Sequence, residues 1–216
     1  MRKGALAVGL LASGFVPLLL ASLLVHERGS APTTDRTIAR DSAYRGSSPP
    51  GRNRLPEFRL RSYHGALVRS RELRDKVVLV TFLDTRCTTQ CPIIAGILGE
   101  AMRKLPAPVR AKTVAFAISV DPEFDTPASV RRFLRGRHAL GTFDFLLGTE
   151  TQLRPVWRAF YVLPVSKTAN PNIHSADVRV FDPQGVWVSI LHVGVDLTPA
   201  NVVQDVETAL EQSETS

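Results

Sequence analysis

The chain has 216 residues, of which 44% are hydrophobic and 22% are charged, proportions typical of a globular protein and not of a disordered one. This length allows one domain and a tail. A net charge of +7 is compatible with a nucleic-acid partner, but the basic residues are scattered, often beside acids as in Arg71-Glu72, and form no stripe interleaved with aromatic residues. We therefore exclude nucleic acid and assign the charge to a solvated surface or to attraction toward anionic lipid headgroups.

The N-terminal segment is apolar and follows two positive charges. Arg2 and Lys3 precede an uncharged run from Ala5 to Val25, which as a helix spans about 31 Å, close to the hydrocarbon thickness of a bilayer. The run is longer than the apolar part of a cleaved signal. Residues 1–26 are therefore predicted to form one transmembrane helix that anchors the chain, with a cleaved signal as the alternative. Because the positive charges stay in the cytoplasm, the remainder is expected on the extracytoplasmic face of a bacterial cytoplasmic membrane.

Residues 27–56 have a different composition from the segments on either side. They are rich in Ser, Pro, Gly, Thr and Arg and show no apolar periodicity, which is typical of a flexible linker. The linker is predicted to separate the anchor from a folded domain over residues 57–212.

The folded domain shows an α/β pattern. Strands are predicted from alternation or from continuous apolar runs bounded by turn residues: Phe58, Leu60 and Ser62 before a turn at Tyr63-His64-Gly65, then Val77–Leu83, Thr113–Val120, Asp177–Phe181 and Val186–Leu191. Helices are predicted from apolar spacing and N-terminal caps: beyond Pro92, after Thr126-Pro127, over Glu150–Tyr161, and after Thr198-Pro199. This order of elements is thioredoxin-like, with a central mixed sheet flanked by helices.

Cys87 and Cys91 are the only cysteines of the chain. A bridge between residues so close would close a small loop and stabilise the fold little, so the pair indicates chemistry more than reinforcement. Pro92 predicts that a helix opens here, with Cys91 as its N-cap residue or just outside it. A helix N-terminus, with Arg86 nearby, favours thiolates. We therefore expect a pair that forms a disulfide or holds a metal ion, and not two inert buried cysteines.

The metal that such a pair suits is copper. Cu(I) accepts two or three soft ligands, and thiolate with imidazole suits copper of either charge, whereas structural zinc takes four ligands. His174 follows Asn170-Pro171-Asn172 in the loop that enters the strand Asp177–Phe181, and in a thioredoxin-like domain this loop faces the redox loop. We therefore expect His174 to join the cysteines. The other four histidines, expected in the tail, in solvent or in packing, are His26, His64, His138 and His192.

These motifs together resemble the Sco/SenC family over about residues 55–212. The resemblance rests on Val77–Leu83 leading into Cys87-x3-Cys91-Pro92, on Ser119-Val120-Asp121-Pro122, Asp125-Thr126-Pro127 and His174-Ser175, and on Asp182-Pro183-x-Gly185. It implies a thioredoxin-like fold and one copper ion, Cu(I) or Cu(II), bound by Cys87, Cys91 and His174. It also implies a role in building the binuclear copper centre of cytochrome c oxidase subunit II.

The chain departs from the family pattern at three places near these motifs. The family usually has Asp before the ligand histidine, where this chain has Ile173. A Gly-Tyr-Thr-like segment often precedes the first cysteine, where this chain has Asp84-Thr85-Arg86. Phe124 stands where a charged residue is common.

Two functions of different classes follow from these residues. The first is a copper metallochaperone, which needs all three residues and whose partner is subunit II or another copper-accepting protein. The second is a thiol–disulfide oxidoreductase in which Cys87 and Cys91 attack and resolve a partner disulfide without His174; some family members are thought to reduce that subunit's cysteines. A peroxiredoxin-like peroxidase is less favoured, because the proline that its loop normally carries is missing upstream of Cys87.

Overall fold

The chain forms both strands and helices along residues 43–215, the part that the computed structural model describes. In chain order they are β1 (Arg59–Ser62), β2 (Leu67–Arg69), η1 (Ser70–Leu73), β3 (Val77–Leu83), α2 (Gln90–Lys104), α3 (Ala107–Ala111), β4 (Thr113–Ser119), α4 (Pro127–Arg135), β5 (Asp144–Leu147), α5 (Glu150–Ala159), α6 (Val165–Thr168), β6 (Asp177–Phe181), β7 (Trp187–His192) and α7 (Pro199–Glu214).

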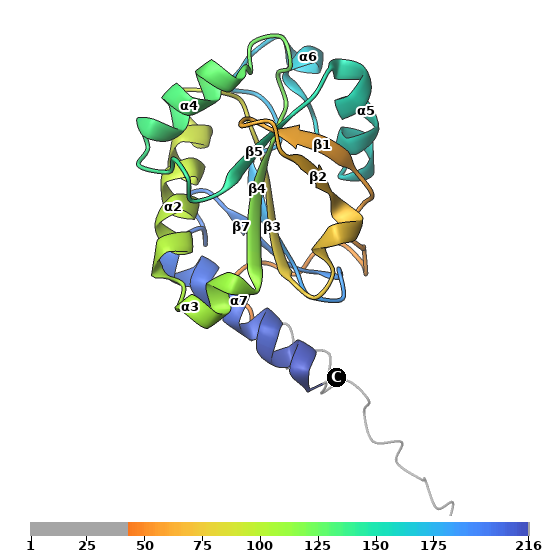
Figure 1. Cartoon of the computed structure of the whole chain (residues 1–216), viewed down its shortest axis with the longest axis vertical. Helices are drawn as coiled ribbons and strands as arrows, with labels where there is room; N and C mark the ends of the chain where they lie inside the picture. Colours follow the sequence, from red (N-terminus) through yellow and green to blue (C-terminus); the bar gives the residue numbers. More distant parts are fainter. Residues whose placement is uncertain (1–42, 216) are drawn as a thin grey trace, which may run out of the picture. The chain divides into compact units, whose positions relative to one another are not determined.

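Hydrogen bonds join these strands in one sheet, in the order β2-β1-β5-β4-β3-β6-β7 (Figure 1). β3, β4 and β5 are parallel to one another. β6 is antiparallel to β3, and β1 is antiparallel to β5. The sheet is therefore mixed and flanked by helices, which confirms the predicted thioredoxin-like fold.

The sheet separates two hydrophobic cores. Every residue of β3 is buried, and successive side chains point to opposite faces. Leu79 and Leu83 enter the core formed with α2, α4 and α7, whereas Val80 and Phe82 enter the core formed with α5. Figure 1 shows α2 and α7 on one side of the sheet and α5 on the other. The strand that leads to the cysteines is therefore fixed on both faces.

Most predicted elements are present within one or two residues. β3 has the predicted bounds, and the side chains of Thr126 and Thr198 accept backbone N–H groups as the N-caps of α4 and α7. The sequence does not predict η1, β5, α3 or α6. Each of these has only four or five residues, too few to display a period.

The start of α2 differs from the prediction that Cys91 is the N-cap residue. The helix begins at Gln90, with Thr89 as N-cap, so Cys91 and Pro92 lie within its first turn. The first four N–H groups of a helix have no acceptor within that helix, so a proline anywhere in this turn removes no hydrogen bond. Pro92 therefore indicates the first turn without fixing the residue at which the turn begins.

Residues 43–56, the described part of the predicted linker, are held by the domain. Ser47 pairs with Ile190 of β7 in an isolated antiparallel bridge. The carboxylate of Asp205 on α7 accepts the backbone N–H groups of Arg45 and of the next residue, at 2.6 and 3.2 Å. Asp205 is fully buried and therefore needs hydrogen-bond donors. The composition of residues 43–56 does not reveal that their backbone supplies these donors.

The predicted anchor, residues 1–26, lies outside the described residues, as do residues 27–42 of the predicted linker. Across residues 43–215 no helix is both long enough and apolar enough to cross a bilayer.

Candidate metal centre

Cys87, Cys91 and His174 meet at one edge of the sheet. Cys87 lies in the loop after β3, Cys91 in the first turn of α2, and His174 in the loop before β6. Because β3 and β6 are antiparallel neighbours, the end of β3 and the start of β6 lie at the same edge. Sγ of Cys91 and Nε2 of His174 are 3.1 Å apart, and the three ligand atoms lie within 4.8 Å of one another. The structure thus brings together the residues that the sequence singles out.

Hydrogen bonding orients the imidazole of His174. Its Nδ1 lies 2.8 Å from the carbonyl oxygen of Ser175, which can only accept, so Nδ1 carries a proton and donates it. Nε2 is then the atom that donates to a thiolate or, once deprotonated, offers its lone pair to a metal. Burial disfavours the imidazolium, but hydrogen bonding with the Cys87 sulfur and with Ser175 outweighs burial and raises the pKa of His174.

The two sulfurs differ in their surroundings, although both cysteines are buried and unbridged. Hydrogen bonding from Cys91 holds the pKa of Cys87 far below its usual range, against the effect of burial and with help from His174. Hydrogen bonding with Cys87, together with burial, raises the pKa of Cys91. One thiolate and one thiol therefore share the site, and a metal bound to both sulfurs would displace the proton of Cys91.

Asn172 links the two loops that carry the ligands. Its Oδ1 accepts the backbone N–H of Thr88 at 2.9 Å and lies 3.3 and 3.4 Å from the hydroxyls of Thr88 and Thr89. These bonds hold the cysteine loop against the loop of His174. Asparagine is a common turn residue, so the sequence marks this segment as a loop and gives no sign of the contact with residues 88 and 89.

Two aspartates hold the segment that leads to the first cysteine. Asp125 accepts the backbone N–H of Thr85 at 2.9 Å and the hydroxyl of Ser119 at 2.6 Å. Asp121 pairs with the guanidinium of Arg86. Burial raises the pKa of Asp125 to about 7, although the bonds from Ser119 and Thr85 oppose this shift. The loop after β4 is therefore the support of the loop after β3.

Asp84 adds a third buried carboxyl beneath the site. Its Oδ1 accepts the N–H of Arg86 at 2.7 Å, and its backbone carbonyl accepts the N–H of Cys87 at 3.3 Å. Its Oδ2 has no hydrogen-bond partner among the described residues. Burial raises the pKa of Asp84. When ionised, this carboxylate would add negative charge close to the ligands and favour a cation there.

The other described histidines lie away from this centre. His64 in the β1–β2 turn lies 2.7 Å from a carboxylate oxygen of Asp144. His192 ends β7, and its nearest acid is Asp196, at 3.9 Å. Within residues 43–215 the cysteine–histidine group is the only group of three or more Cys, His, Asp or Glu residues close enough to hold a metal.

The donor set fits a soft metal ion. Two atoms that each lie about 2.0–2.3 Å from a shared ion are at most about 4.6 Å apart. Ligand atoms already within 4.8 Å of one another can therefore close on an ion with little movement. Two sulfurs and one imidazole are a sufficient set for Cu(I), whereas structural zinc takes a fourth ligand.

Known proteins resemble the chain across this whole domain. A model of the SCO1/SenC family matches residues 47–211. The SCO1 protein homolog of Bacillus subtilis is 26% identical over 158 residues, which cover 70% of this chain and 80% of that protein. The solution structure of apo Sco1 from Thermus thermophilus has a TM-score of 0.63 at 28% identity, over 76% of this chain and 95% of that chain. Bradyrhizobium japonicum ScoI with copper bound has a TM-score of 0.60 at 26% identity, over 72% and 98%.

Proposed function

The chain belongs to the SCO1/SenC family, and we propose that it is a copper metallochaperone that holds one copper ion and passes it to an acceptor protein. The observation that carries the proposal is the meeting of Cys87, Cys91 and His174 within 4.8 Å. Support comes from the similar ScoI of Bradyrhizobium japonicum, whose structure holds copper. The copper is cargo, taken as Cu(I) or Cu(II).

The three ligands have separate roles in holding and releasing copper. Cys87 supplies a sulfur that is already ionised, and Cys91 loses its proton as copper binds. His174 is half-buried in a loop, whereas both cysteines are buried. An incoming ligand of the acceptor therefore reaches the bond to His174 first, and the copper leaves the two sulfurs afterwards.

Titration with Cu(I) tests the three-ligand site. The reduced full chain, kept in non-ionic detergent without oxygen, should bind one copper ion per chain. His174→Ala should weaken the affinity by more than about tenfold, because the loss even of a group that only orients a ligand costs about 10–100-fold. His192→Ala is the matched control, because His192 lies away from the cysteines, and it should bind as the wild type does. A His174→Ala chain that binds copper with undiminished affinity would make the three-ligand site wrong.

We propose subunit II of cytochrome c oxidase as the acceptor, and an anchor over residues 1–26 that holds the domain on the extracytoplasmic face of a bacterial cytoplasmic membrane. The family resemblance and the apolar run after Lys3 support this location. Alkaline phosphatase fused after residue 216 should be active in bacterial cells, because that enzyme needs disulfides that form outside the cytoplasm. An inactive but intact fusion would contradict the location.

A thiol–disulfide oxidoreductase is the second candidate, favoured by the lowered pKa of Cys87 beside the raised pKa of Cys91. The Cys87 thiolate would attack a partner disulfide, form a mixed disulfide and release one partner thiolate. Cys91 would then lose its proton, attack the Cys87 sulfur and release the second partner thiolate. The pair gives up two electrons, which the partner gains.

The two candidates differ in their need for His174. If the protein is a reductant, Cys91→Ser should trap a mixed disulfide with oxidised subunit II, and His174→Ala should reduce that subunit at the wild-type rate. If it is a metallochaperone, His174→Ala should lose copper delivery, and a copper-free chain should leave the acceptor without metal.

A further inference from the structure

A hollow of about 370 Å³ lies beside the metal centre, between the segment that leads to Cys87 and helix α4. Guanidinium groups and aromatic rings dominate its lining: Arg86, Arg132, Arg137, Phe124 and Phe133. Because Arg86 precedes Cys87 directly, the hollow adjoins the segment that carries the first cysteine.

The arginine side chains of the hollow differ in their hydrogen-bond and ion-pair partners. Arg86 pairs with Asp121 and lies over the ring of Phe124, with 3.5 Å between guanidinium carbon and ring centroid. The side chain of Arg132 makes no hydrogen bond or ion pair with any residue in 43–215. The guanidinium of Arg137 donates a hydrogen bond only to the carbonyl of its neighbour Gly136, and lies 5.8 Å from the centroid of the Phe133 ring. Two exposed positive charges therefore face the hollow without an anion.

The nearby acids do not neutralise these charges. Asp121 is taken by Arg86, and Asp125 is buried, where it accepts from Thr85 and Ser119. Glu123, in the same loop, forms no ion pair within the described part of the chain. The hollow is thus a cationic site that lacks a counter-charge.

Exposed large apolar side chains lie near the segments that carry the metal ligands, and one of them lines the hollow. Ile93, Phe124, Leu163 and Ile173 are 48%, 42%, 46% and 53% exposed. Ile173 precedes His174, Ile93 follows Cys91 by two residues, and the N–H of Leu163 donates to the hydroxyl of Ser175. Of the seven exposed large hydrophobic residues in 43–215, three therefore lie close to the ligands, and a fourth, Phe124, lines the hollow. Exposed apolar side chains that gather in this way mark a surface for another protein.

We propose that the hollow and the exposed apolar side chains, the apolar rim, bind an acidic segment of the protein that receives the copper. One carboxylate of that segment lies in the hollow between Arg132 and Arg137. The apolar side chains beside that carboxylate contact Phe124 and Ile173. This inference rests on the proposed function, because it assigns the partner of the same site. A small inorganic anion would satisfy the arginines but would leave the apolar rim uncovered, so the occupant is a protein segment.

An NMR titration of the ¹⁵N-labelled full chain in non-ionic detergent tests the surface without copper. The probe is the acetylated, amidated peptide Leu-Glu-Leu-Glu-Leu, and its control has Gln in place of Glu. The acidic peptide should shift the amide signals of Phe124 and Ile173 and the side-chain signals of Arg132 and Arg137, and the control should not. Equal shifts with the control peptide, or equal shifts of all these signals with inorganic phosphate alone, would overturn the proposal.

Charge-reversal variants provide a second test of the docking surface. Arg132→Glu/Arg137→Glu should raise the dissociation constant of the acidic peptide at least about tenfold, because like charges then meet in the hollow. Arg110→Glu/Arg135→Glu is the matched control, since it changes the net charge equally at exposed arginines outside the hollow, and it should change binding less than twofold. Equal weakening by both pairs would contradict a specific site.

A copper titration of the same variants separates this inference from the proposed function. Arg132→Glu/Arg137→Glu should bind Cu(I) as tightly as the wild type, since neither arginine is a ligand. Loss of peptide binding with copper affinity retained supports the docking surface. A wild type that binds the peptide and no copper would refute the metallochaperone proposal while leaving the surface in place.

Discussion

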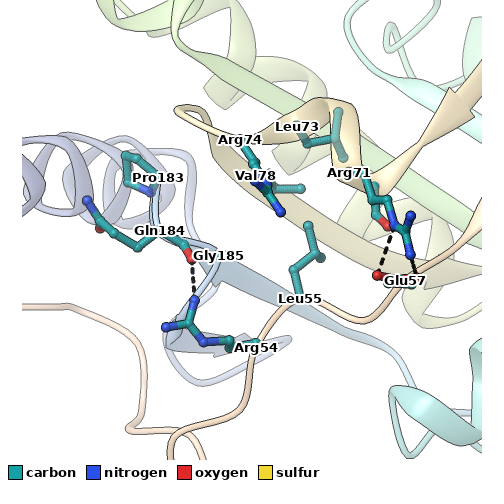
Figure 2. Close-up of a pocket in the computed structure, with 11 residues that line it drawn as sticks. Arg54, Leu55, Glu57, Arg71, Leu73, Arg74, Val78, Pro183, Gln184 and Gly185 are labelled. Carbon is teal, nitrogen blue, oxygen red and sulfur yellow. Dashed lines mark hydrogen bonds and ion pairs between the residues drawn. The ribbon is translucent and has the colours of Figure 1, made fainter.

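Arginines line a hollow at each end of the sheet, and the partners of their side chains differ between the two hollows. The far hollow, of about 250 Å³, lies where β3 begins and where β6 turns into β7. There Arg71 donates two hydrogen bonds to Glu57, at 2.9 and 2.7 Å, and Arg54 donates to the carbonyl of Gln184 at 2.9 Å (Figure 2). Each of these bonds joins segments of the chain to one another.

At the metal end Arg132 has no such partner within the described residues, and Phe124 is exposed beside it. No large hydrophobic residue that the structure describes as exposed lines the far hollow. Arg54 and Arg74 of the far hollow also form no ion pair within the described residues. What distinguishes the metal end is that its arginines lie beside an exposed aromatic ring and on the segment next to Cys87.

The largest effect is expected from removing a ligand at the metal end. Cys91→Ser should lower the Cu(I) affinity by more than about 1000-fold, because a hydroxyl is a hard donor and a poor ligand for Cu(I). Arg71→Ala, at the far end, should leave the affinity unchanged. Both are measured by competition with a Cu(I) chelator, and a Cys91→Ser chain that competes like the wild type would contradict the assigned ligand set.

Acids at the two ends should respond to pH in opposite directions. Burial raises the pKa of Asp125 from 3.8 to about 7, whereas Arg71 lowers the pKa of the exposed Glu57. Between about pH 4 and 7 the folded chain therefore keeps a proton on Asp125 that the unfolded chain has lost, so this contribution to stability falls as pH rises. The contribution of Glu57 instead falls as pH drops through its lowered pKa.

Asp125→Asn should remove the first of these pH dependences. The free energy of unfolding of the wild type, minus that of the variant, should fall by about 1–4 kcal/mol between pH 4 and pH 7.5. Urea unfolding at the two pH values measures it. Asp84, whose charge helps to raise the pKa of Asp125, and the buried Asp205 are present in both chains. A difference that stays constant or grows with pH would show that Asp125 is ionised in the folded chain.

A smaller effect is expected from separating the two ligand loops. Asn172→Ala removes the acceptor of the Thr88 N–H without touching a ligand, and should weaken Cu(I) binding about tenfold. Lys167→Ala is the control, because Lys167 lies on the neighbouring helix α6 and its side chain is exposed. Equal affinity in the wild type and Asn172→Ala would mean that the loops hold their positions without this bond.

The smallest effect is expected at the far end. The Arg71 and Glu57 side chains are 73% and 70% exposed, and ion pairs so exposed contribute little to stability. Arg71→Ala should therefore shift the midpoint of thermal unfolding only slightly, as measured by circular dichroism. A large drop would mean that the Glu57 pair holds the β3 end of the fold together.

Much of this molecule follows from short-range patterns in its sequence. β3 is a continuous apolar run, and Thr126-Pro127 and Thr198-Pro199 are local helix starts, so their positions can be predicted. β5 has four residues and is a strand because β4 and β1 lie on either side of it. Its pairing depends on tertiary contacts that no local pattern records.

In the candidate site, too, some features follow from local sequence patterns and others depend on tertiary contacts. Cys87 and Cys91 are visible as a pair, and the antiparallel pairing of β3 with β6 accounts for the position of His174. The contact of Asn172 with Thr88, and the support of Thr85 by Asp125, join residues far apart in the chain. Side chains of these types are common in loops, so only the folded arrangement shows what they hold.

X-ray absorption at the copper edge of the loaded full chain tests the central claim most directly. The ligands predict two sulfur atoms and one nitrogen atom bound to each copper ion, and His174→Ala should lose the nitrogen and keep both sulfurs. A spectrum with sulfur alone in the wild type, or one unchanged by His174→Ala, would contradict the three-ligand copper site.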